Sequence, residues 1–213
     1  MEADDPWPTS GSNTESLVAK RETLRNTLKQ VRACEVCAKD LPLGPRPVVQ
    51  VGARAKVIII GQAPGTKVHE SGVPWDDASG DHLREWLGVT KDVFYAAARF
   101  SILPMGFCYP GAKGGGDAPP RPECAPLWHS PLLDFAPKGA LLLLVGMYAQ
   151  KYYLGKERKK TLGDTVRAAE EYLPRFFPLP HPSWRSKHWM KKNPWFSSSI
   201  LPSLQREIAL RST

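Results

Sequence analysis

Residues 57–65 read VIIIGQAPG and residues 141–146 read LLLLVG. Each stretch begins with a short apolar run, the pattern of a strand buried on both faces of a parallel sheet. A glycine ends each run, so both strands lead into connections at one edge of the sheet. With a further candidate strand at Phe176 to Leu179, the alternation of strands and helices predicts a three-layer α/β/α domain. Helices are expected at residues 81–87, 92–98, 147–155, 161–172 and 198–210.

The amino-terminal part of the chain combines a tail with a helix. Residues 1–13 are acidic and rich in Pro and Ser, which predicts a disordered tail and not a signal peptide. Apolar residues repeat at helical spacing behind Thr14, a favourable cap, so residues 15–33 are expected to form an amphipathic helix. No run approaches the roughly 18 apolar residues of a membrane span, so we expect a cytoplasmic protein. We also expect it to be a monomer with one domain, residues 14–213.

The charge of the chain favours a polyanionic partner, since the formal net charge is +8. No acidic residue lies between Glu171 and Glu207, where basic residues alternate with tryptophans. Such a combination holds phosphates and unstacked bases, but a solvated basic face over core tryptophans would look the same. The residues are Arg175, Trp184, Arg185, Lys187, Trp189, Lys191, Lys192, Trp195 and Arg206.

Four cysteines in a cytoplasmic chain indicate metal binding or catalysis more than disulfides. Cys34 and Cys37 form a C-x-x-C pair, whereas Cys108 and Cys124 flank a segment rich in Gly and Pro. Part of this segment, KGGGDAPPRP (113–122), lacks the spacing of a phosphate-binding P-loop. We interpret it as a flexible loop between ligands.

Three motifs, GQAPG (61–65), GVPW (72–75) and HPS (181–183), follow one another in an order and at separations that resemble those of the uracil-DNA glycosylase superfamily. The four cysteines resemble the ligand set of its iron–sulfur class, so the resemblance implies a 4Fe–4S cluster on Cys34, Cys37, Cys108 and Cys124. It covers roughly residues 34–183. The fold that it implies is α/β/α with a mostly parallel, four-stranded central sheet.

The resemblance also implies a DNA glycosylase that flips a deaminated base, uracil or a broader set, and hydrolyses its N-glycosidic bond. His181 matches the histidine that donates a hydrogen bond to the charge developing on the base, and Trp75 matches the aromatic residue on which the base stacks. Both could instead be purely structural. Further matched positions that would bind substrate or phosphates are Gly61, Ala63, Pro64, Gly65 and Ser183; those that would contact DNA behind HPS are Trp184, Arg185 and Lys187.

The carboxylates of the family's first motif are missing, because Gln62 and Ala63 occupy their positions. However, DDASG (76–80) resembles the GDASG stretch of another branch, whose aspartate is the proposed catalytic carboxylate. Asp77 is therefore our first choice, beside Gln62 and His181 in the catalytic set, with Asp76 or Glu70 as alternatives. Asp77 could also merely cap the following helix.

Base selectivity is open, because Pro104 stands where the family uses an asparagine to read uracil. With Gln62 and Ala63, this departure motivates an alternative function, a damaged-DNA-binding protein that has lost turnover. A zinc-stapled nucleic-acid module is a third possibility, which fifteen residues between Cys108 and Cys124 fit poorly. No lysine matches a catalytic position, so the enzyme is expected to be monofunctional.

Overall fold

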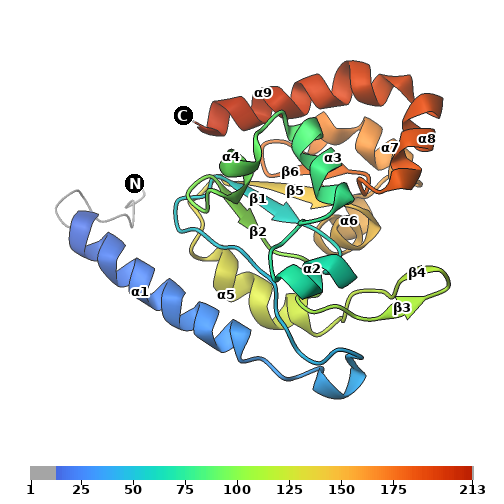
Figure 1. The fold of residues 1–213 in the computed structure, drawn as a ribbon. Helices are drawn as coiled ribbons and strands as arrows, with labels where there is room; N and C mark the ends of the chain where they lie inside the picture. Colours follow the sequence, from blue (N-terminus) through green and yellow to red (C-terminus); the bar gives the residue numbers. More distant parts are fainter. Residues whose placement is uncertain (1–12, 213) are drawn as a thin grey trace.

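The computed structural model describes residues 13–212 and contains a four-stranded, fully parallel sheet with strand order β2-β1-β5-β6 (Figure 1). Its strands are β1 (Val57–Ile60), β2 (Phe100–Ile102), β5 (Leu141–Val145) and β6 (Phe176–Leu179). The predicted α/β/α fold is confirmed, as are the three predicted strands. The edge strand β2 was not predicted, since three residues carry too little pattern to reveal a strand.

Side chains of the two central strands alternate between two helical layers, as the period of two in a strand requires. Val57 and Ile59 of β1 pack into one apolar cluster, and Ile58 and Ile60 pack into the other. The first layer contains α3 (Ala78–Leu87), α4 (Lys91–Tyr95), α7 (Leu162–Arg167) and α9 (Leu201–Ser212). The second contains α1 (Asn13–Arg32), α5 (Ser130–Leu133) and α6 (Met147–Leu154) (Figure 1). The sheet is thus buried on both faces, and its carboxyl edge is left for loops.

Several predicted helices differ from the observed ones in their bounds. Helix α1 begins at Asn13, so Thr14 lies inside it and does not precede it; the rest of the predicted tail lies outside the described residues. The segment 161–172 divides into α7 and a 3-10 turn, and 198–210 divides into a π-helical turn and α9. Three α-helices were not predicted, α2 (Thr66–Ser71), α5 and α8 (Trp184–Lys192). Within residues 13–212, no helix is both long and apolar enough to cross a membrane.

The predicted flexible loop at 113–122 was wrong in its first half. Residues 112–117 form a β-hairpin of β3 (Ala112–Lys113) and β4 (Gly116–Asp117) that projects beyond the sheet (Figure 1). Its two turn residues, Gly114 and Gly115, have φ of 59° and 77°. Two successive positive φ angles are what the favoured two-residue hairpin turn requires, and glycine adopts them without steric cost.

Candidate active site

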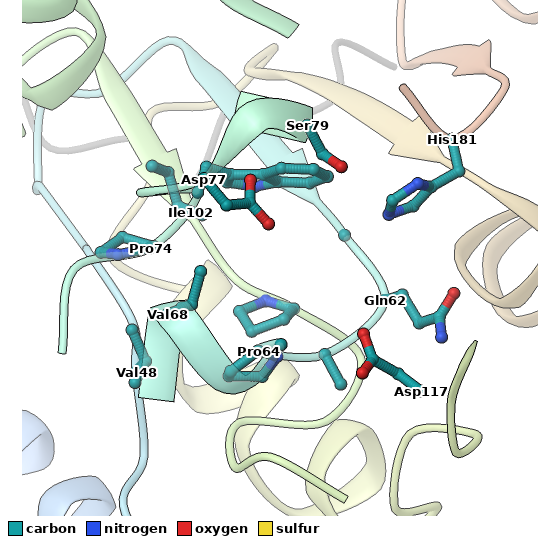
Figure 2. A pocket seen from close by; sticks show the side chains of 15 residues that line it. Val48, Gln62, Pro64, Val68, Pro74, Asp77, Ser79, Ile102, Asp117 and His181 are labelled. Carbon is teal, nitrogen blue, oxygen red and sulfur yellow. The ribbon is translucent and has the colours of Figure 1, made fainter. Parts of the chain in front are cut away.

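A cavity of about 90 Å³ lies at the carboxyl edge of the sheet, where β1 runs into the GQAPG segment (Figure 2). This volume is several times what one water molecule needs. Open α/β folds bind their ligands at this edge. The residues lining it are Val48, Gly61, Gln62, Ala63, Pro64, Gly65, Val68, Pro74, Trp75, Asp77, Ser79, Ile102, Pro104, Asp117 and His181. Three motifs far apart in the sequence therefore meet around one cavity.

The GQAPG segment is held in place by the chain that leaves β2. The Met105 amide donates to the Gly61 carbonyl at 2.9 Å, and the Gly106 amide donates to the Gln62 carbonyl at the same distance. These bonds continue the parallel pairing of β1 and β2 beyond the strands and bring Pro104 to the cavity wall. Within the described chain, no hydrogen bond engages the side-chain amide of Gln62, so that amide is available to a ligand.

Trp75 has a backbone φ of 58°, the only positive φ outside glycine among residues 13–212. Such a conformation costs a bulky residue on the order of 1–3 kcal/mol and persists only where the surroundings impose it. Two glycines leave the room that this conformation needs, because a Cβ at Gly80 would lie 1.8 Å from the Trp75 carbonyl oxygen, and one at Gly61 would lie 2.9 Å from the indole ring. In addition, the Tyr95 hydroxyl donates to the Pro74 carbonyl at 3.0 Å. The indole ring thus lies against Gly61 at the end of β1, and the Trp75 backbone lies against Gly80.

Asp77 both caps a helix and lines the cavity. Its Oδ1 accepts a hydrogen bond from the Gly80 amide at 2.8 Å at the start of α3, so the carboxylate is fixed in orientation. The two alternatives lie elsewhere: Asp76 forms an ion pair with Lys91 at 3.5 Å, and Glu70 is exposed on α2. Asp77 is therefore the only one of the three that contributes to the cavity.

His181 enters the cavity from the segment that follows β6 (Figure 2). Its ring centroid lies 5.6 Å from that of Trp75, with an interplanar angle of 34°. Burial lowers the pKa of His181, while the negative charge of Asp77 opposes this shift, so the imidazole is neutral at pH 7. The adjoining Pro182 carbonyl accepts a hydrogen bond from Nδ1 of His82 on α3 at 3.2 Å, which ties the HPS turn to the helix that Asp77 caps.

Behind Pro104 lies a buried histidine that the sequence analysis missed. His129 Nε2 donates to the Pro104 carbonyl at 3.0 Å, and the Tyr153 hydroxyl donates to Nδ1 at 2.6 Å, a pairing that fixes a single neutral tautomer. Burial lowers the pKa of His129 to about 4. The carbonyl of Pro104 therefore already accepts one buried hydrogen bond, from a residue that does not line the cavity.

The residues predicted to contact DNA lie outside the cavity on α8. Arg185 and Lys187 are exposed, and Trp184 is 72 % exposed, with the Arg185 guanidinium 4.7 Å from the centre of its ring. Ser183 immediately precedes α8 and does not line the cavity. In contrast, Trp189 and Trp195 pack against the core, so the structural interpretation holds for these two.

The four cysteines line a second cavity, which shares no residue with the first. All four are free, and all but Cys34 are buried. Burial raises the pKa of the Cys37 and Cys108 thiols and raises that of Cys124 to about 12. Arg121 joins the two cysteine-bearing segments through an ion pair to Asp40 at 2.8 Å, and a second ion pair, to Glu123 of its own segment at 2.6 Å, holds its guanidinium in place.

Two observations bear on whether a metal group fits this second cavity. No group of three or more His, Cys, Asp or Glu side chains between residues 13 and 212 could hold a single metal ion. A cluster is a different case, because each of its irons takes one thiolate and the four sulfurs need not converge on a point. The buried indole Nε1 of Trp128, which also lines the cavity, has no hydrogen-bond partner in this part of the chain. The sulfur of a cluster would accept that N–H, so the residues fit a cluster better than a zinc ion.

The family profile described as the uracil DNA glycosylase superfamily matches residues 49–205, which is most of the chain. The match includes all three motifs and every residue lining the first cavity except Val48. The chain therefore belongs to the uracil DNA glycosylase superfamily.

Proposed function

We propose that the protein is a monofunctional DNA glycosylase that flips a deaminated base out of DNA and hydrolyses its N-glycosidic bond. Superfamily membership supports a glycosylase acting on DNA. The observation that carries the proposal is that one cavity collects the GQAPG segment, Trp75, Asp77 and His181. Trp75 provides an aromatic face on which a base can stack, Asp77 provides a carboxylate, and His181 provides a neutral imidazole.

Breaking an N-glycosidic bond leaves positive charge on the sugar and negative charge on the base, so the site has to stabilise both. The neutral imidazole of His181 donates a hydrogen bond to the base as its negative charge develops. Asp77, fixed by the Gly80 amide, holds a negative charge for the sugar cation. Trp75 provides a stacking surface, which is worth about 1–3 kcal/mol per base.

Base selectivity in this pocket is expected to be broad. A pocket that reads a base with a dedicated polar side chain rejects other bases because buried polar groups are left unpaired. Pro104 has no such side chain, and its carbonyl is bonded to His129. Recognition then rests on stacking, on backbone amides and on Gln62, whose amide both donates and accepts. We therefore propose release of uracil together with at least one other deaminated or alkylated base.

Helix α8 is proposed to bind the DNA strand beside the cavity. Its exposed basic residues suit phosphates, whose contacts position a protein on DNA without reading sequence. The exposed ring of Trp184, held by the Arg185 guanidinium at 4.7 Å, is the wedge that fills the gap left by the flipped base. The basic residues are Arg185, Lys187, Lys191 and Lys192.

The cysteine cavity is proposed to hold a 4Fe–4S cluster, which would align the chain with the iron–sulfur class. When bound, the cluster would supply iron–thiolate bonds that join the segment after α1 to the segment after β2. Because the two cavities share no residue, its role is structural. Anaerobically purified protein should be brown, with absorbance near roughly 400 nm. Colourless, metal-free and fully stable protein would contradict the cluster but leave the glycosylase proposal intact.

One experiment tests the activity against its alternative, a damaged-DNA-binding protein without turnover, which Ala63 and Pro104 in the cavity wall favour. The protein is incubated with a uracil-containing oligonucleotide, and one half of the sample is treated with alkali while the other half is run as a gel shift. We expect strand cleavage at the uracil position only after alkali. A gel shift without abasic product would establish the binder instead.

A further inference from the structure

The cavity contains a second carboxylate, Asp117, which none of the three motifs includes. Asp117 is the last residue of β4 and pairs in register with Ala112, and the Ala118 amide donates to the Gly111 carbonyl at 2.7 Å just below. The hairpin is therefore closed at its base as well as at its turn. It holds position 117 at the mouth of the cavity.

Asp117 approaches the first motif closely. Its Oδ2 lies 3.3 Å from the position that a Cβ at Gly65 would occupy. Figure 2 shows its carboxylate pointing into the cavity from the end where Gln62 lies, whereas Asp77 enters from the start of α3. The two carboxylates thus reach one cavity from different elements.

The two carboxylates differ in their hydrogen bonding. Oδ1 of Asp77 is committed to the Gly80 amide at 2.8 Å. In contrast, no hydrogen bond or ion pair from residues 13–212 engages the Asp117 carboxylate, whose oxygens are free to accept from a ligand or a water molecule. A fixed carboxylate suits the stabilisation of a cation, and a free one suits proton transfer.

The charge of Asp117 runs against DNA binding, because a carboxylate at the mouth of the cavity repels the phosphates on either side of a flipped nucleotide. Asp117 is exposed at the mouth of the cavity, but local desolvation of its carboxylate, and secondarily the negative charge of Asp77, raise the pKa of Asp117. A carboxylate with a raised pKa is, in its ionised form, a better proton acceptor than an ordinary carboxylate. The position of Asp117 therefore lowers the affinity for DNA but favours proton transfer from a water molecule.

We propose that Asp117 is a catalytic residue of this site, the general base that binds the attacking water and accepts its proton. The proposal rests on the proposed glycosylase function. It gives Asp117 the activation of water, which Ala63 of the first motif cannot perform because it has no carboxylate. As the bond between the base nitrogen and C1′ breaks, its electron pair leaves with the base, which His181 stabilises. The water oxygen bonds to C1′, and one water proton passes to the Asp117 carboxylate, which later returns it to solvent.

The test compares Asp117→Asn, Asp117→Glu and the wild type in single-turnover base release at saturating protein, alongside gel shifts on the same strand. Asp117→Asn should slow release by about 100-fold or more, the usual contribution of a general base, while DNA affinity stays equal or increases. Asp117→Glu keeps a carboxylate and should retain more activity than Asp117→Asn. Asp92→Asn, which removes an exposed carboxylate on α4, is the matched charge control and should release base at the wild-type rate.

Two further measurements separate a base from a structural residue. Release by the wild type should decline at acid pH as Asp117 is protonated, and this decline should be smaller in Asp117→Asn, in which Asp77 is the remaining carboxylate of the cavity. Formate should partly restore release by Asp117→Ala, since it supplies a small carboxylate. Release by Asp117→Asn within twofold of the wild type, or equal losses of binding and release, would overturn the role of Asp117 alone. A wild type that binds damaged DNA but releases no base would overturn the glycosylase function and this proposal with it.

Discussion

Replacing His181 is the substitution that isolates a single step of the proposed reaction. The imidazole offers one N–H to the departing base, and its neutral form is favoured because burial lowers its pKa. Loss of one preorganised donor to a developing charge typically costs about 2.7–4 kcal/mol, or roughly 100- to 1000-fold in rate. His181→Phe removes this donor but keeps an aromatic ring against Trp75. We therefore expect release by this variant to fall by that factor.

His181→Ala removes the ring as well as the donor. The rings of His181 and Trp75 lie 5.6 Å apart at 34°, and such aromatic pairs contribute about 0.5–1.5 kcal/mol beyond their buried area. Because Trp75 is held in a strained backbone conformation, loss of this neighbour should also loosen the stacking surface. His181→Ala is thus expected to be slower than His181→Phe by a further factor of roughly 2 to 10.

The assay is single-turnover release from a labelled uracil strand, with binding followed by gel shift. Both variants should bind DNA nearly as the wild type does, because His181 lies in the cavity and the basic residues lie on α8. If binding and release fell by the same factor, His181 would be a structural residue. If His181→Phe released base at the wild-type rate, the imidazole would have no part in the departure of the base.

Three other predictions concern stability, the cluster and the DNA surface. The pKa of His129 is about 4 in the fold and ordinarily about 6.5, so the unfolded chain binds the proton more tightly. The free energy of unfolding should therefore fall by up to roughly 3 kcal/mol as pH drops from 6.5 to 4. His129→Gln should flatten this decline, measured by urea denaturation. In cluster-loaded protein, Trp128→Phe removes an N–H from the sulfurs and should lower the midpoint potential measured by spectroelectrochemistry; an unchanged potential would assign the indole another partner. Neutralising four residues of α8 should flatten the log–log salt dependence of DNA binding by up to about four units with little change in sequence preference, and an unchanged slope would make them a solvated face. These four are Arg185, Lys187, Lys191 and Lys192.

The sheet could be predicted where strands are wholly apolar. The VIII and LLLLV runs are buried on both faces and contain no polar residue to break the pattern. In contrast, β2 has only three residues, and its central Ser101 looks like loop sequence. The strand exists because it pairs with β1, and that tertiary contact leaves no trace in the local pattern.

The pocket residues within motifs could be predicted because each motif is a loop at a strand end. Eight of the predicted residues line the cavity, and the spacing of the motifs reflects the elements between them. Asp117 was missed because the glycine-rich stretch KGGGD was interpreted as a flexible loop. Two glycines that provide successive positive φ angles instead close a hairpin, and that hairpin brings the carboxylate back to Gly65.

The tryptophans of the basic segment show where sequence reasoning stops. Trp184, Trp189 and Trp195 all lie among basic residues, yet only Trp184 is exposed, and the other two pack edge to face at 5.5 Å. Helical phase decides between these outcomes, because Trp184 and Trp189 are five positions apart and point to different sides of α8. Since α8 was not predicted, that phase could not be assigned.

The most direct test of glycosylase activity is to identify the released base by mass spectrometry. Wild-type protein is incubated with single- and double-stranded oligonucleotides that contain uracil, hypoxanthine, xanthine or etheno-cytosine. The masses of the free bases and of the remaining strands are then measured. The proposed site predicts free uracil, at least one further base from the panel, and an intact abasic strand from each reaction. Tight binding to these strands with no free base from any of them would contradict it.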